Sequence, residues 1–196
     1  SNGWVDVIKY LISVGADVNK TFDGGYFHGA APLHTACKEY HIDAVNVLLN
    51  AGANPSITDT RGYTPLHEVT SWYRVKNEEA ALAIMNRLVM HGVNINFCTK
   101  EGCTPLMYII KFSPNFLRGI ELLIACGCDV NIVNYKGETP LSYAIQYNCD
   151  IEIIKILLNA GANPNFIGKD GETFLQIARS KRNEAIVKLL LEAGAY

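Results

Sequence analysis

The sequence has no excess of charge of either sign, because 17 Lys and Arg residues are balanced by 19 Asp and Glu residues, for a net charge of −2. Such a chain has no overall field that would draw it onto nucleic acid or an anionic membrane. It also lacks any apolar run approaching the ~18 residues that span a bilayer, and its start has no basic segment followed by an apolar one. We therefore expect neither nucleic-acid binding nor membrane insertion.

The motifs of several enzyme classes are also missing. The sequence contains no Walker loop, dinucleotide-binding fingerprint or HExxH zinc motif, and its histidines cannot be assembled into a nucleophile–base pair. Cys126 and Cys128 are separated by one residue and have no matching second pair, so they are not a structural zinc signature. We expect no enzymatic activity, no catalytic residue, no metal and no cofactor.

A disulfide framework is not expected either, although the chain contains six cysteines. Such frameworks belong to small, loop-rich domains that are short of core, whereas 49% of these residues are hydrophobic. Reduced thiols are the better interpretation. They indicate a location in the cytoplasm, with the nucleus as the alternative.

What the sequence does contain is a repeat. Thr64-Pro65-Leu66-His67 has close counterparts that begin at Thr104 and Thr139 and weaker ones at Ala31 and Thr173. Their second residues lie 33 to 40 positions apart. A second marker, Gly-Ala-Asp or a variant of it, precedes each counterpart and also ends the chain. Two independent markers in phase indicate a stack of similar units, with a period close to the roughly 33 residues of one repeat class.

On these motifs the sequence resembles an ankyrin repeat domain over essentially its whole length. The resemblance implies an all-α repeat fold, in which stacked helix-turn-helix units are linked by β-hairpin-like turns into one solenoid domain over residues 1–196. We place a partial repeat at 3–20 and five units at 21–54, 55–94 (with a long loop between its helices), 95–129, 130–163 and 164–196. Residues 3–8 align with the start of a second helix, so we expect a fragment of a longer protein.

The residues inside each unit fit this interpretation. A glycine three positions before the second residue of each TPLH-like motif, such as Gly62 before Pro65 or Gly102 before Pro105, suits a hairpin that needs positive φ. Thr followed by Pro suits a helix start, because the Thr side chain caps free N–H groups and Pro needs no donor there. The resemblance also implies that His34 and His67 hydrogen-bond between neighbouring hairpins and helices.

Departures from the repeat indicate where function lies, since insertions in a solenoid form loops that often bind. One insertion brings Tyr26 and Phe27 to a hairpin tip, where they either bind a partner or pack locally. Another, around Trp72 and Tyr73, lengthens the connection between two helices. The alternative for Trp72 and Phe112 is that their loops bend inward and bury both rings.

Ankyrin domains usually bind partners on a concave surface made of hairpin tips and first helices. Mapped onto this sequence, Trp72, Phe112 and Tyr147 recur at one position in three consecutive units, and we expect them to form a strip flanked by hairpin tyrosines. The complete set of residues that we expect to bind the partner is Tyr26, Phe27, Arg61, Tyr63, Trp72, Tyr73, Lys111, Phe112, Tyr135 and Tyr147.

The function implied is that of a non-catalytic module that binds a peptide or protein, as the recognition or scaffold part of a larger adaptor, and that is monomeric as a fragment. Two alternatives remain open at this point. In one, Trp72 and Tyr73, near Glu39 and Glu68, form an aromatic cage for a modified lysine or small ligand. In the other, the chain is a purely structural segment of a longer solenoid.

Overall fold

The computed structural model describes residues 3–22, 29–71, 77–169 and 171–196. Within these ranges the chain forms helices and isolated β-bridges but no extended strand, and none of the helices is long and apolar enough to cross a bilayer. The helices are α1 (Gly3–Ser13), α2 (Pro32–Lys38), α3 (Ile42–Asn50), α4 (Pro65–Ser71), α5 (Glu78–Met90), α6 (Pro105–Phe112), α7 (Leu117–Ala125), α8 (Pro140–Gln146), α9 (Ile151–Asn159), α10 (Phe174–Ser180) and α11 (Glu184–Glu192).

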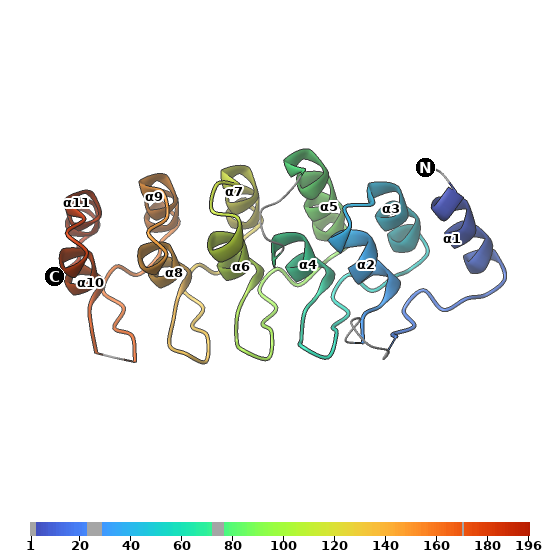
Figure 1. The fold of residues 1–196 in the computed structure, drawn as a ribbon, viewed down its shortest axis with the longest axis horizontal. Helices are drawn as coiled ribbons and strands as arrows, with labels where there is room; N and C mark the ends of the chain where they lie inside the picture. Colours follow the sequence, from blue (N-terminus) through green and yellow to red (C-terminus); the bar gives the residue numbers. More distant parts are fainter. Residues whose placement is uncertain (1–2, 23–28, 72–76, 170) are drawn as a thin grey trace.

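The helices lie in two rows, and the termini lie at opposite ends of the molecule (Figure 1). The first helices α2, α4, α6, α8 and α10 pack on one another in order, and the second helices α1, α3, α5, α7, α9 and α11 form the other row. The turns that join the units project from the side of the first helices (Figure 1). This arrangement confirms the predicted all-α solenoid.

Each first helix begins at the second residue of its TPLH-like motif, as predicted. The Thr104 hydroxyl accepts a hydrogen bond from the Met107 amide at 3.3 Å, and the Thr139 hydroxyl accepts one from the Ser142 amide at 3.2 Å. Both threonines have extended backbone, and proline occupies the first helical position that follows. Side-chain caps of this kind satisfy amides that have no partner inside the helix.

The hairpin tips stack on one another through their backbones. In the tip before α6, the Thr99 amide donates to the Cys103 carbonyl at 3.0 Å, and the Tyr135 amide of the next tip donates to the Glu101 carbonyl at 3.0 Å. Gly102 has a φ of 78°, and a Cβ there would lie 2.9 Å from the Tyr135 nitrogen. Glycine is therefore required both for the turn and for the approach of the next hairpin.

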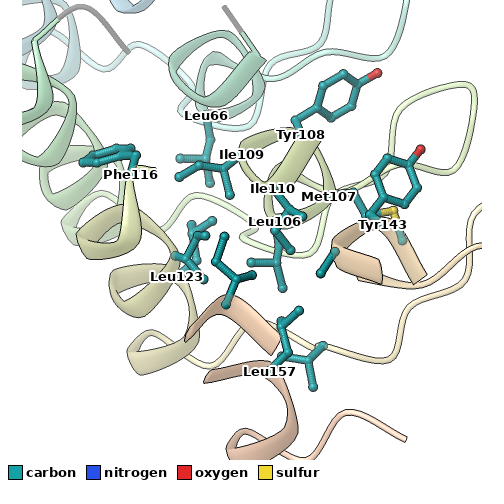
Figure 2. Packing of buried hydrophobic residues seen from close by; sticks show 14 of the residues in the cluster. Leu66, Leu106, Met107, Tyr108, Ile109, Ile110, Phe116, Leu123, Tyr143 and Leu157 are labelled. Carbon is teal, nitrogen blue, oxygen red and sulfur yellow. The ribbon is translucent and has the colours of Figure 1, made fainter. Parts of the chain in front are cut away.

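The core runs continuously between the two rows of helices. Leu106 and Ile109 of α6, Leu123 of α7 and Leu157 of α9 belong to one cluster of buried side chains (Figure 2). Because each unit buries its apolar surface against its neighbours, the first helices are held in register along the array.

The first helix of the chain, α1, belongs to the second row and packs on α3. Ile8 packs against the core and Val5 and Ile12 are half-buried, whereas Val7, Tyr10 and Leu11 are exposed and Trp4 is 74% exposed.

Candidate functional site

Aromatic and cationic side chains from three consecutive units meet on the side of the first helices and hairpins. We call this set the aromatic cluster, and its members are Arg61, Tyr63, Tyr108, Lys111, Phe112, Tyr143 and Tyr147. Tyr108 and Tyr143 are buried, Tyr63 and Phe112 are half-buried, and the other three members are exposed. The cluster therefore has a buried floor and an accessible outer layer.

The first half of the cluster joins the α4 unit to α6. The Tyr63 hydroxyl donates to the Tyr108 hydroxyl at 2.7 Å, and the two rings meet edge to face with centroids 5.1 Å apart. Phe112 stacks on Tyr108 with centroids 5.7 Å apart and planes inclined by 24°. Tyr108 and Phe112 are four residues apart on α6, so they lie on one face of that helix.

The second half of the cluster joins α6 to α8 through Lys111. Its ammonium nitrogen lies 5.1 Å from the ring centroid of Phe112, 5.9 Å from that of Tyr143 and 5.7 Å from that of Tyr147. Tyr143 and Tyr147 are again four residues apart, with centroids 5.5 Å apart. These distances are within the range of cation–π attraction, which holds the ammonium among the rings.

Arg61 fixes the hairpin end of the cluster. Its guanidinium donates to Asp59 at 2.7 Å and to Glu68 at 2.8 Å, and its central carbon lies 4.2 Å from the Tyr63 ring centroid. One Asp59 oxygen also accepts the Tyr63 amide at 2.8 Å. Burial raises the pKa of Glu68, and the nearby Arg61 charge opposes this rise. The position of Tyr63 is thus fixed by the Asp59 hydrogen bond to its backbone and by the Arg61 guanidinium over its ring.

Figure 2 shows the hydroxyls of Tyr108 and Tyr143 pointing away from the buried leucine and isoleucine side chains. Burial raises the pKa of both phenols and that of Tyr63, so all three are neutral hydroxyl groups at physiological pH. Neutral phenols and ring faces offer hydrogen bonds and apolar contact, which suits recognition rather than proton transfer.

The structure brings together five of the residues that the sequence predicts to bind a partner. Arg61, Tyr63, Lys111, Phe112 and Tyr147 all belong to the aromatic cluster.

Tyr135, in contrast, lies on a hairpin tip, is 70% exposed and makes no ring contact with the aromatic cluster in the described part of the chain. Tyr26, Phe27, Trp72 and Tyr73 lie outside the described residues, so their expected roles stay predictions.

Sequence reasoning missed the floor of the cluster, Tyr108 and Tyr143. Each lies three residues after the Pro that starts its helix and four residues before Phe112 or Tyr147. This i, i+4 spacing of two aromatic pairs in consecutive units was the available signal, because side chains four apart share a helix face.

The histidines of the repeat motif have the predicted role between units. The Nε2 atom of His34 lies 2.9 Å from the Tyr63 carbonyl, and that of His67 lies 3.2 Å from the Cys103 carbonyl. His67 is buried, and burial lowers its pKa to about 4. Within the described ranges, no group of three or more histidine, cysteine or acidic side chains is placed to hold a metal ion.

Comparison with known proteins decides the family. The model for ankyrin repeats, which describes three copies, matches residues 1–81, 72–167 and 113–196. The chain belongs to the ankyrin repeat family. A crystal structure of an ankyrin repeat domain from Acinetobacter baumannii AYE matches it with a TM-score of 0.83 and 31% identity, covering 100% of this chain and 95% of that one.

Longer proteins contain similar ankyrin regions. A protein from Danio rerio named putative palmitoyltransferase ZDHHC13 is 29% identical over 96% of this chain, and human Rabankyrin-5 is 32% identical over 95% of it. The chain spans only 28% and 16% of the lengths of these two relatives. Ankyrin repeats are in general protein-interaction modules, and the whole-protein activities of the relatives are not assigned to this region.

Proposed function

We propose that this ankyrin domain is a non-catalytic interaction module that binds a peptide segment or protein surface across the aromatic cluster. The observation that carries the proposal is the continuity of the cluster over three units, from Tyr63 through Phe112 to Tyr147. Tyrosine and arginine are enriched among the residues that dominate binding energy at protein interfaces.

The floor of the cluster supports this proposal because it removes a cost of binding. Tyr108 and Tyr143 are held by packing, and Tyr108 accepts a hydrogen bond from Tyr63. A ring already fixed in place loses little conformational entropy when a partner contacts it. The accessible rings on this floor therefore form a prearranged surface.

We further propose that the domain serves as the recognition or scaffold part of a larger adaptor and acts as a monomer in the cytoplasm or nucleus. The length of the relatives supports the first point, because each carries its similar region within a much longer chain. The free state of all six cysteines agrees with a reducing compartment.

A binding experiment tests the role of the aromatic cluster. Proteins captured from a cell lysate by the wild type are identified and then titrated, as purified proteins, against the wild type, Tyr147→Ala and Tyr196→Ala. Tyr196 is 90% exposed at the chain end and serves as the matched control. We expect Tyr147→Ala to lose affinity at unchanged melting temperature and Tyr196→Ala to bind like the wild type. Equal binding by all three would refute the proposed surface.

The purely structural alternative predicts a different outcome for the same variants, namely that no captured protein depends on Tyr147. The cage alternative predicts tighter binding of a methyl-lysine peptide than of its unmodified twin. The aromatic cluster itself gives the cage little support, because Phe112, Tyr143 and Tyr147 surround the ammonium of the chain's own Lys111. A partner cation would have to displace it.

A further inference from the structure

We propose that the segment bound by the aromatic cluster presents one Asp or Glu side chain to Lys111, with apolar or aromatic residues on either side of it. This inference rests on the proposed function, because it specifies the chemistry of the partner at that same surface. It follows from which polar groups of the cluster already have partners and which do not.

Most polar groups of the cluster are hydrogen-bonded within the protein. Arg61 is paired with Asp59 and Glu68, and the Tyr63 and Tyr108 hydroxyls bond each other. The Tyr143 hydroxyl accepts a hydrogen bond from the Asn134 amide group at 3.2 Å. These groups would lose existing contacts on binding a ligand atom, so they contribute shape and apolar surface more than polar recognition.

Lys111 and Tyr147 differ from the other members. Among the described residues, the Lys111 ammonium forms no ion pair with any carboxylate, and the Tyr147 hydroxyl forms no hydrogen bond. The ammonium is nevertheless held near three rings, which restricts a side chain that is otherwise flexible. A positioned cation that forms no ion pair, beside the half-buried Phe112 ring and the exposed Tyr147 ring, is complementary to a carboxylate.

The surroundings of Lys111 favour a single negative charge. Glu101 and Lys111 line the same small hollow, together with Tyr108 and Tyr143. Glu101 repels any anion there, and Lys111 is the one cationic residue among those that line the hollow, so its charge can offset one carboxylate but not a second. Phosphate recognition usually relies on arginine or on several cations, but Arg61 is occupied by two carboxylates. An isolated acidic residue among apolar ones therefore fits better than a phosphorylated residue or an acidic run.

Selection from a phage-displayed library of random peptides tests this chemistry. The wild type, Lys111→Glu, Lys111→Met, Glu101→Gln and Tyr147→Ala are each used as bait. Lys155→Glu is the matched control, because Lys155 lies on α9 in the second row, where its side chain is 44% exposed and pairs with Glu152, and reversing its charge changes the net charge by the same amount. Selected sequences are then synthesised, and their affinities are measured by fluorescence polarisation.

We expect the wild type to select peptides with one acidic residue between apolar or aromatic residues. Exchange of that residue for its amide, or Lys111→Met, should weaken binding by roughly ten- to a hundredfold, as for a hydrogen bond between charged groups. A lysine in place of the acidic residue should restore binding to Lys111→Glu but not to the wild type. Lys155→Glu should bind like the wild type, and Glu101→Gln should tolerate a second acidic residue.

Three outcomes would overturn the inference. If the binding of the selected peptides depends on Tyr147 but their sequences show no preference for an acidic residue, the inference is refuted and the proposed function stays intact. Tighter, Lys111-dependent binding of a phosphoserine version of a selected peptide would refute the choice of a single carboxylate. A library in which the wild type enriches nothing beyond what Tyr147→Ala enriches would refute both this inference and peptide binding at the cluster.

Discussion

Acidification should destabilise this domain through His67, a residue of α4 whose side chain reaches the hairpin before α6. Its Nδ1 atom accepts the Thr64 amide at 3.1 Å, and its Nε2 atom lies 3.2 Å from the Cys103 carbonyl. Only a neutral imidazole with its proton on Nε2 satisfies both partners, because a protonated Nδ1 cannot accept a hydrogen bond. The ring also contacts Tyr63 and Tyr108, so its state bears on the aromatic cluster.

The magnitude follows from the pKa of His67. Burial lowers that pKa from its ordinary value of 6.5 to about 4. Above 6.5 neither the folded nor the unfolded chain binds the proton, so the full stability is present. As the pH falls toward 4 the unfolded chain alone binds it, and at ~1.4 kcal/mol per pH unit the free energy of unfolding drops by about 3 kcal/mol. Below that pH both states bind the proton, and the loss stops.

Urea unfolding followed by circular dichroism at neutral pH and near pH 4 measures this loss, with His67→Gln as the control. The amide of glutamine can both donate and accept but does not titrate in this range. We expect the drop in the free energy of unfolding to be larger in the wild type than in the variant by about 3 kcal/mol. Burial raises the pKa of Glu68, so its titration acts with the opposite sign, but it is common to both proteins. Equal drops in the two proteins would refute the reasoning.

Further predictions concern the turn glycines, the core and the hydroxyl pair. In urea titrations, Gly102→Ala should lower the free energy of unfolding by more than about 2 kcal/mol and Gly127→Ala by about 1 kcal/mol. Both glycines have positive φ, but only Gly102 lies against the next hairpin. Equal losses in the two variants would contradict this. Leu157→Ala should cost about 2–5 kcal/mol in the same assay, because the side chain is fully buried, and a loss below that of a surface substitution would show that the site is not packed. Tyr63→Phe and Tyr108→Phe should each cost about 1 kcal/mol, and the double variant little more than either, because the two hydroxyls bond each other; additive losses in thermal unfolding would exclude that bond.

Much of the fold was predictable because its signals are local. The Thr-Pro helix starts and the glycine turns each concern neighbouring residues, and the caps of Thr104 and Thr139 and the positive φ of Gly102 confirm them. The partners of His34 and His67 were predictable in kind only through the family resemblance, since each hydrogen bond joins residues about one repeat apart.

The candidate site was predicted in part. Position within the repeat identified Phe112, Tyr147 and Lys111 as residues of one surface, and the structure places the Phe112 and Tyr147 rings near the Lys111 ammonium. The same reasoning missed Tyr108 and Tyr143, because a buried ring on a first helix looks like ordinary core until its neighbours are known. It also placed Tyr135 at a hairpin flank of the strip, where the ring is 70% exposed, and the role of Tyr135 in binding stays a prediction.

The sequence by itself determined the repeating unit, because helix caps, turn glycines and apolar spacing act within a few residues of one another. It also determined that three consecutive units carry aromatic side chains at matching positions. Only the tertiary structure decided that Lys111 of one unit reaches the rings of the next, and that Tyr63 bonds Tyr108. Those contacts depend on the stacking of separate helices and hairpins, which is set by how their buried surfaces fit together and not by any one stretch of the chain.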